Sequence, residues 1–413
     1  MKSILVLAHS ANIGGAELAL KALIDSLGDT YRWTVVIPGT KPPDVQIINR
    51  NTTYVNIPSL PRWYYKAYKS PRHIERNALA ESLARLEVLA AESDILLTNT
   101  MTIPWLGFIA QKINRPHIWY IHEYGDLDCN LRFIPGYHQT VSTIGDCSSR
   151  VLTVSNGLRD HLSEIIPSCQ IDIIHQSIDF AAFADITPFR FTGELKLLCM
   201  GAIKPSKGQL IALEAVEKLP AGARVKLDIV GPSADREYTR LLMEKAGKLD
   251  NVEVAVRRYN PVYELSNHDV MLMCSQHEGL GRVTLEGLAS GRLVVGYGCQ
   301  STGELLADHR GIVYTPNTPE SLGNALLEVL SNQKTIDPEK NRAFVRQNYS
   351  DEIQVKDFQN CVEKAIETTV NNTHSLERYL DTIEQRRLWK PKSKFLYRIK
   401  KMIRTCLGNG HPI

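Results

Sequence analysis

Residues 269–290 read DVMLMCSQHEGLGRVTLEGLAS, and this stretch decides the fold class. It begins with a short apolar run, which is typical of a buried strand. From residue 282 on, the apolar residues follow a helical spacing. Gly279 and Gly281 lie between the two segments, where a loop carries the chain from strand to helix. If this unit recurs along the chain, it predicts a parallel α/β architecture.

The unit does recur on both sides of this stretch. In the first half we predict strands within 3–8, 33–37, 53–57, 94–99, 117–122 and 150–155, and helices near 15–27, 72–92, 102–113 and 156–165. In the second half we predict strands within 196–201, 224–230, 252–257, 269–275, 292–298 and 311–315, and helices near 207–218, 234–249, 282–290, 301–307 and 318–331. The two series predict an α/β protein with two doubly wound domains that face each other across a cleft.

The domain boundaries are predicted where the alternation of strands and helices stops. Pro188 lies in a segment without a sustained period, which indicates a linker. We therefore expect a first domain at 1–180, a linker at 181–192, a second domain at 193–350, a helix at 351–372 that packs back on the first domain, and a basic tail at 373–413.

Composition excludes several classes of protein. A chain of 413 residues is longer than one hydrophobic core usually supports, and 43% hydrophobic with 23% charged residues is typical of soluble globular proteins. The net charge is +3, but nine Lys or Arg and no acidic residue lie between Arg386 and Arg404, which leaves −6 for the remainder. This balance argues against a uniformly basic nucleic-acid binder.

The cysteines and the apolar runs of the sequence bear on where the chain is located. The eight cysteines are scattered without a CxxC pair, which indicates reduced thiols and a cytoplasmic location and argues against a metal knuckle. The N-terminal MKSILVLAHS contains an apolar run of only five residues, too short for a signal peptide. No run reaches the ~18 apolar residues of a membrane span, so any membrane contact is expected to be peripheral.

Loops after strands are the places where such folds bind ligands. After the first strand, Gly14 and Gly15 open a helix, where backbone amides can approach an anion, although from this loop alone a tight strand-to-helix turn is the stronger explanation. The spacing of these glycines is not GxGxxG, which removes most of the support for a nicotinamide dehydrogenase as the function. In the second domain, Lys204 and Lys207 precede a helix and can hold a diphosphate, or they are solvated loop lysines.

The segment EGLGRVTLE, residues 278–286, combines two carboxylates with two glycines. The glycines permit close backbone approach, and the amides from Leu280 to Val283 can face an anion at the start of a helix. Glu278 can accept hydrogen bonds from sugar hydroxyls, and Glu286, one turn into the helix, can reach those of a ribose. A helix with a flexible glycine-rich cap is the competing explanation.

Two other strand ends carry polar residues. His122, followed by Glu123, can project into the cleft from the strand HIWYIH, although a histidine in such a place is more often structural. Ser155 and Asn156 follow another strand and are expected to cap the next helix.

Several motifs occur together: GGAE near the N-terminus, YIHEY, VSN, a KG loop that opens the second domain, and EGLGRVTLEGLASG followed by LVV and TGE. Over roughly residues 1–370 this combination resembles the retaining glycosyltransferases of family 4, which have two facing Rossmann-like domains of the GT-B type. The resemblance implies transfer of a sugar from a nucleoside diphosphate donor with retention of configuration, without a bound metal ion or other cofactor.

The resemblance also implies roles for particular residues. Lys207 would grip the diphosphate, Glu278 the sugar and Glu286 the ribose. His122 would lie near the donor sugar and the acceptor, and no strong side-chain base is expected because the donor phosphate itself can take the acceptor proton. The catalytic set would be Glu278, His122 and Lys207, and the donor-binding set Gly14, Gly15, Lys204, Lys207, Gly279, Leu280, Gly281, Arg282, Val283 and Glu286.

The chain departs from the family pattern at two places. Ala202 stands where an arginine is usual, which removes a bidentate phosphate ligand. Lys204, Arg282 or the pair Arg257 and Arg258 could replace its charge. The segment HQSID, residues 175–179, stands where NGVD is common, so the turn between the domains is expected to differ in detail.

The C-terminal stretch KFLYRIKKMIRTCL, residues 394–407, predicts an amphipathic basic helix. Its basic residues around one apolar face suit an anionic membrane surface, and we expect residues 386–406 to bind there; a helix that packs back on the protein is the alternative. A second basic and aromatic cluster, RWYYKAYKSPRH at 62–73, could rest on the membrane, stack on acceptor sugars, or cover the core.

Together these features predict a cytoplasmic, peripherally membrane-bound retaining glycosyltransferase that extends a lipid-linked glycan in surface polysaccharide synthesis. Its expected partners are a nucleoside diphosphate sugar, a glycan or lipid-linked glycan and the anionic inner face of the membrane. Two alternatives stay open: a degenerate sugar-nucleotide-binding protein without turnover, suggested by Ala202, and a nucleotide-sugar epimerase, which has no use for a basic tail.

Overall fold

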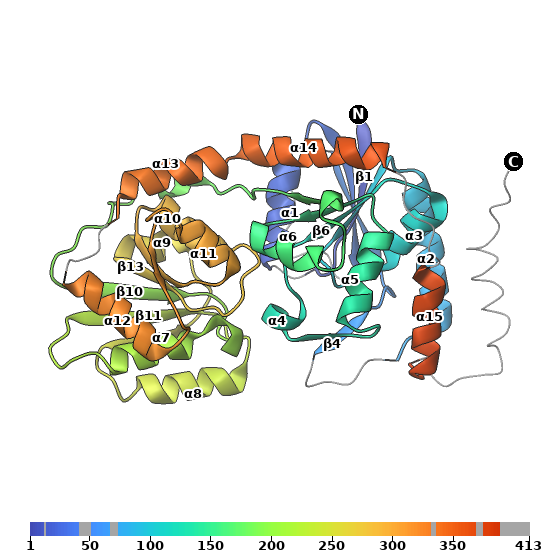
Figure 1. Cartoon of the computed structure of the whole chain (residues 1–413). Helices are drawn as coiled ribbons and strands as arrows, with labels where there is room; N and C mark the ends of the chain where they lie inside the picture. The colour runs from blue at the N-terminus through green and yellow to red at the C-terminus, as the bar shows by residue number, and fades with distance from the viewer. Residues whose placement is uncertain (12–13, 41–50, 67–72, 332–335, 369–374, 389–413) are drawn as a thin grey trace, which may run out of the picture.

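The structure, a computed structural model, describes residues 1–11, 14–40, 51–66, 73–331, 336–368 and 375–388. Figure 1 shows two α/β domains side by side, each built on a parallel sheet. The predicted fold class is therefore confirmed, with two Rossmann-like domains.

Seven strands form the sheet of the first domain, all of them paired in parallel. Their order is β3 (Thr52–Ile57), β2 (Tyr31–Pro38), β1 (Lys2–Leu7), β5 (Ile95–Asn99), β6 (His117–Ile121), β8 (Arg150–Thr153) and β9 (Ile171–Ile173). The central strands β5 and β6 are buried at every residue, because helices cover both faces of a parallel sheet. The helices are α1 (Gly15–Ser26), α2 (Arg76–Ala91), α3 (Trp105–Ile113), α5 (Tyr137–Asp146) and α6 (Asn156–Ser163).

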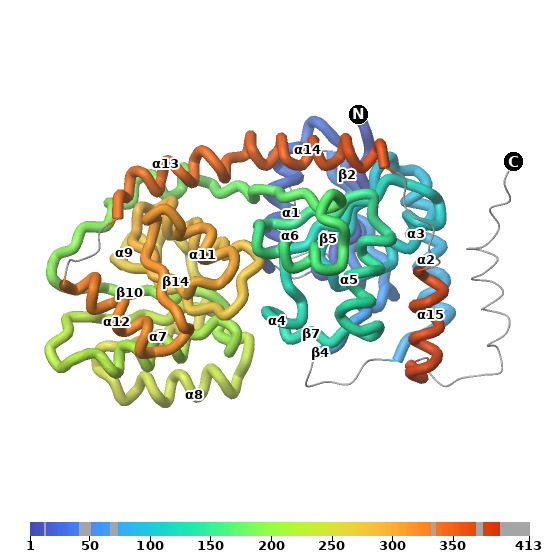
Figure 2. Tube along the Cα trace, in the orientation of Figure 1, coloured from blue at the N-terminus to red at the C-terminus, as the bar shows by residue number. Residues whose placement is uncertain are grey.

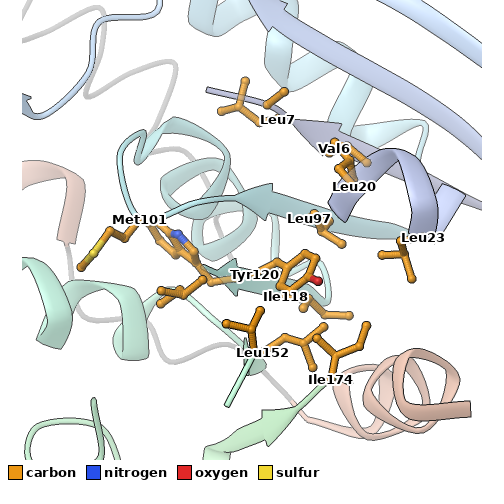
Figure 3. Packing of buried hydrophobic residues seen from close by; sticks show 14 of the residues in the cluster. Val6, Leu7, Leu20, Leu23, Leu97, Met101, Ile118, Tyr120, Leu152 and Ile174 are labelled. Atoms are coloured by element: carbon orange, nitrogen blue, oxygen red, sulfur yellow. The ribbon is translucent and has the colours of Figure 1, made fainter. Parts of the chain in front are cut away.

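The core of this domain joins sheet and helices (Figure 3). Leu97 of β5 pairs with Ile118 of β6, and both belong to one buried cluster with Leu20 and Leu23 from α1. All four side chains are 3% exposed or less. This packing holds the carboxyl ends of the strands in place and so positions the loops that follow them.

The second domain has a six-stranded parallel sheet. The order is β12 (Val252–Val256), β11 (Val225–Gly231), β10 (Leu195–Met200), β13 (Val270–Met273), β14 (Leu293–Tyr297) and β15 (Ile312–Tyr314). The helices are α7 (Gln209–Glu217), α8 (Arg236–Ala246), α9 (Pro261–Asn267), α10 (Arg282–Ala289), α11 (Gln300–Leu306) and α12 (Pro319–Leu330). Residues 269–290, which decided the fold class, form β13, a loop and α10.

The chain passes between the domains twice. It leaves the first domain after β9 and enters β10 at Leu195, and it returns along α13 (Pro338–Asn348) and α14 (Asp351–Glu367). Figure 2 shows α13 over the second domain and α14 over the first. Phe358 of α14 packs against Tyr31 and Trp33, so this helix belongs to the core of the first domain.

The expected tail at 373–413 begins with a packed helix. In α15 (Ser375–Gln385), Tyr379 contacts the rings of Trp63, Trp105 and Phe108, and the Ile74 amide donates to the carbonyl of Leu388 at 2.9 Å. Aromatic burial explains why residues 375–388 stay on the first domain. The predicted membrane helix at 394–407 lies outside the described residues, and within those that are described no helix is long and apolar enough to cross a membrane.

Several short elements were not predicted. They include β4 (Tyr64–Lys66), which pairs antiparallel with β7 (Leu131–Phe133), and α4 (Asp126–Cys129) between β6 and β7. Segments of three or four residues are too short to show a period, and tertiary contacts stabilise them. In the aromatic cluster at 62–73, Trp63 is fully buried and stacks on Trp119, so this part of the cluster belongs to the core, and residues 67–72 lie outside the described residues.

Candidate active site between the two domains

A cavity of about 380 Å³ lies where the carboxyl ends of the two sheets face each other. From the first domain it is lined by the segments after β1, β5 and β6, and from the second by those after β10 and β13. The expected site residues that line it are Gly14, Gly15, His122, Lys204, Lys207, Glu278, Gly279, Leu280, Gly281 and Arg282. Val283 and Glu286 lie behind this wall, within α10.

Gly14 and Gly15 form the start of α1. Gly14 is the N-cap in an extended conformation, and its carbonyl accepts the first helical hydrogen bond, from Leu18. A Cβ added to Gly15 would meet nothing within 4 Å, so this backbone borders open space. The first-turn amides of α1 lack intrahelical acceptors and can face an anion in the cavity.

Lys207 and Glu278 form an ion pair at the wall of the second domain. Burial alone would lower the pKa of Lys207, but the charge and hydrogen bond of Glu278 outweigh it and raise this pKa. Burial would likewise raise the pKa of Glu278, and Lys207 reverses the direction and lowers it. Both groups therefore stay charged at neutral pH and place a cation and an anion side by side in the cavity.

The loop between Glu278 and α10 brings the two domains into direct contact. A Cβ on Gly279 would lie 2.0 Å from the backbone oxygen of His122, so only glycine permits this approach. The Ser155 hydroxyl donates to the Gly279 carbonyl at 2.5 Å and also accepts from the Leu158 amide at 3.2 Å. Ser155 thus caps α6 as expected and ties that helix to the loop of the other domain.

Arg282 and Glu286 lie one turn apart on α10, with Arg282 Nε 3.4 Å from Glu286 Oε1. The second oxygen of Glu286 is buried without a hydrogen-bond partner among the described residues, and so is one terminal nitrogen of Arg282. Burial raises the pKa of Glu286 to about 7, although the charge and hydrogen bond of Arg282 oppose it. The pair therefore has unused acceptor and donor capacity next to the cavity.

Both ring nitrogens of His122 are occupied. Nε2 lies 2.8 Å from the Asn99 side-chain oxygen and donates to it, and Nδ1 accepts from the Gln176 amide at 3.0 Å. Burial, with a further effect of His9, lowers the pKa of His122 to about 3. A neutral imidazole fixed on both sides can orient a ligand, but it is poorly placed to abstract a proton.

The candidates for replacing the charge missing at Ala202 lie at different places in the structure. Arg257 forms a bidentate pair with Glu264, at 2.6 and 3.2 Å, and neither Arg257 nor Arg258 lines the cavity. Lys204 and Arg282 do line it. Positive charge opposite the first domain therefore comes from these two side chains and Lys207.

Several cavity residues were not predicted from the sequence. His9, Glu17, Lys66, Thr100, Thr102, Asp128 and Gln176 all line the cavity. Gln176 belongs to the unusual segment HQSID, and its departure from the common pattern was the available signal. Lys66 belongs to the basic and aromatic cluster at 62–73, which was the available signal, but the short strand β4 brings it to the cavity only in the folded protein.

The two halves of the chain match two family models. Residues 13–182 match Glycosyltransferase Family 4, and residues 186–351 match Glycosyl transferases group 1. An uncharacterized glycosyltransferase of Methanocaldococcus jannaschii is 21% identical over 231 residues, which are 55% of this chain and 62% of that relative. The chain thus spans less than two thirds of that relative's length.

Solved structures resemble the whole two-domain arrangement. HepE of Anabaena, in complex with UDP and glucose, is 18% identical with a TM-score of 0.71, over 88% of this chain and 100% of that one. Sucrose-phosphate synthase of Thermosynechococcus elongatus is 16% identical with a TM-score of 0.70, over 88% and 99%. At these identities the likeness is one of fold.

Proposed function

Since this chain belongs to the family 4 glycosyltransferases and has their two-domain GT-B fold, we propose that it transfers a sugar from a nucleoside diphosphate sugar to a glycan acceptor, with retention of anomeric configuration. Apart from Lys204, the donor-binding residues expected from the sequence are part of the proposal. That HepE was solved with UDP and with UDP-glucose supports a nucleotide-sugar donor for this fold.

The main support for this function is the Lys207–Glu278 ion pair at the interdomain cavity. A leaving diphosphate needs cations, and Lys207 with Arg282 and the first amides of α10 would supply them. Glu278 would then accept hydrogen bonds from the hydroxyls of the transferred sugar. The unpaired buried oxygen of Glu286 would accept from a ribose hydroxyl.

The proposed chemistry needs no side-chain base. His122 is neutral and held by Asn99 and Gln176, so its role would be to position the sugar and the acceptor. The proton of the attacking hydroxyl would pass to an oxygen of the leaving diphosphate on the same face of the sugar. Attack and departure on one face preserve the anomeric configuration.

A ligand panel tests donor binding directly. We would measure the melting temperature with GDP, UDP, dTDP, CMP and NAD, because a ligand at about 100 times its dissociation constant stabilises a protein by ~2.7 kcal/mol. Selective stabilisation by one nucleoside diphosphate is expected and identifies the base. The matching sugar nucleotide would then be assayed for transfer, with the configuration of the product read by NMR.

A binding protein without turnover is the second candidate, and Ala202 favours it because this position, where an arginine is usual in the family, has no guanidinium to bind phosphate. Stabilisation by a nucleoside diphosphate without transfer to any glycan would support it. Stabilisation by none of the ligands would contradict both functions.

We further propose that the acceptor is linked to a lipid and that the enzyme acts at the inner face of the membrane in surface polysaccharide synthesis. The basic segment at 386–406 supports this location, since anionic lipid attracts each basic side chain by about 1 kcal/mol. Co-sedimentation with anionic vesicles, and its loss on neutral vesicles, would test it.

A further inference from the structure

Two ammonium groups, one from each domain, meet at one side of the cavity. Lys66 lies on β4 of the first domain, and Lys204 lies in the loop after β10 of the second. Lys66 Nζ donates to the Cys129 carbonyl at 2.8 Å, and Lys204 Nζ donates to the Asp128 carbonyl at 3.4 Å. Because the two acceptors are consecutive residues of α4, the two cations are close together.

Lys204 differs in its orientation from Lys207, three residues later. Lys207 pairs with Glu278 inside its own domain. Lys204 instead reaches across the cavity to the first domain, where its carbonyl partner lies. It therefore faces the half of the protein that receives the acceptor in the proposed function.

Neither cation is neutralised by an ion pair among the described residues, although the charge of Asp128 acts on Lys66 from farther away. Among the described residues, no carboxylate lies within ion-pair distance of Lys66 or Lys204. The Asp128 carboxylate accepts from the amides of Tyr124 at 3.1 Å and Gly125 at 2.8 Å, so the backbone of its own turn occupies it.

The groups around Lys66 and Lys204 do not cancel the repulsion between these two ammonium groups. Burial lowers the pKa of Lys66, and Lys204 lowers it further, while Cys129 and Asp128 oppose the effect. Burial and the charge of Asp128 raise the pKa of Glu123, which also lines the cavity, to about 8, so this carboxyl is largely neutral at pH 7. An incoming anion would relieve this repulsion.

We infer that Lys66 and Lys204 bind an anionic group, a phosphate or a carboxylate, that the acceptor carries. The inference rests on the proposed function and assigns Lys204, expected above among the donor ligands, to the acceptor. Tyr64 and Leu131 line the cavity beside the pair and offer an aromatic and an apolar surface to the rest of the acceptor. Since the lysines belong to different domains, the same anion also links the two halves of the cleft.

Calorimetry with a probe anion tests the inference. Pyrophosphate is titrated into the protein saturated with the nucleoside diphosphate that the ligand panel selects, so that the donor site is filled. Lys66→Met keeps the length of the side chain and removes its charge, and we expect it to weaken pyrophosphate binding by about tenfold or more. We expect the affinity for the nucleoside diphosphate to change by less than about twofold.

The control is Lys248→Met, which makes the same change at an exposed lysine outside the cavity and should alter neither affinity. Malonate in place of pyrophosphate distinguishes a carboxylate from a phosphate group, and binding of either supports the inference.

Two outcomes would overturn the inference. Equal losses of affinity for pyrophosphate and nucleoside diphosphate in Lys66→Met would assign the two lysines to the donor. The same holds if the wild type, saturated with nucleoside diphosphate, binds neither pyrophosphate nor malonate. If the wild type binds no nucleoside diphosphate, the proposed function fails, and the titration without nucleotide still decides whether anion binding depends on Lys66.

Discussion

Glu278 and Lys207 lie 71 positions apart in the chain and form one ion pair in the fold. At the scale of single residues, the site consists of charges whose protonation is set by burial and by each other. Burial alone would neutralise both members of this pair, and their mutual attraction keeps them charged. For Glu286 the result is the opposite, because burial raises its pKa by more than Arg282 lowers it.

The charge of Glu278 is expected to be essential for transfer. Glu278→Gln keeps the shape of the side chain and removes the charge, so we expect transfer to fall by about 100-fold or more. The measurement is the rate of sugar transfer at saturating donor, with circular dichroism to verify the fold. Glu320→Gln breaks a surface pair with Lys218 and serves as the matched control, which should retain full activity. Near-normal transfer by a folded Glu278→Gln protein would remove this residue from the catalytic set.

Glu286 is expected to make stability depend on pH. Its pKa is raised from 4.5 to about 7 in the folded protein, so the folded state binds the proton more tightly than the unfolded state. Stability is therefore lost as pH rises from about 4.5 through about 7, and the loss approaches ~3 kcal/mol at higher pH. Glu286→Gln removes this loss, and its free energy of unfolding should exceed that of the wild type at pH 8 and match it near pH 4.5. Denaturant unfolding at both pH values would measure the difference, and an equal effect at both would contradict it.

At the scale of elements, the site depends on loops that join the ends of strands to helices. The loop between β13 and α10 carries Glu278 and touches the end of β6 across the cleft. The sequence predicted this loop from its glycines, because their spacing between a strand and a helix is local information. It did not predict the partner of Gly279, because His122 comes from a different domain.

Gly279→Ala is expected to impair this contact. The new Cβ would lie 2.0 Å from the His122 oxygen, which forces one of the two loops to move. Overpacking of this kind costs about 1–3 kcal/mol, so we expect the melting temperature to fall by several degrees and transfer to decrease by about tenfold. Gly247→Ala, at the exposed end of α8, is the control and should leave both unchanged. Unchanged transfer in Gly279→Ala would mean that the cleft works without this approach.

At the scale of the whole molecule, direct contacts connect the two domains beside the cleft. The amide and side-chain nitrogens of Asn156 donate to the two oxygens of Glu304, at 3.2 and 2.5 Å. These residues belong to α6 and α11, which lie against each other across the domain boundary. The pair lies at the N-terminus of α6, where the helix dipole favours a carboxylate.

Glu304→Ala should open the molecule in the absence of ligand. We expect a larger radius of gyration in solution scattering than for the wild type, and a smaller difference when the selected nucleoside diphosphate is added. Glu320→Ala removes a surface carboxylate and should leave the radius unchanged. Identical scattering curves for Glu304→Ala and the wild type would show that other contacts keep the domains together.

Two truncations separate packing from membrane binding. A chain that ends after Leu388 keeps α15 and loses the basic segment from residue 389 on, so we expect it to lose binding to anionic vesicles without a change in melting temperature. A chain that ends at residue 374 also loses Tyr379 and Ile383 from the core, and burial of large side chains is worth about 1.5–3 kcal/mol each, so its melting temperature should fall by several degrees. Vesicle binding by the chain that ends after Leu388 would refute a membrane role for the basic segment.

The sequence by itself determined the two doubly wound domains, the order of most strands along the chain, and several of the loops that line the cavity. These properties follow from the period of apolar residues and the position of glycines, which are local. Only the tertiary structure decided that Lys207 pairs with Glu278, that Arg257 is occupied by Glu264, that both nitrogens of His122 are bonded, and that Lys66 reaches the cavity. Each of these depends on groups from separate segments meeting in space, where burial and neighbouring charge set their chemistry.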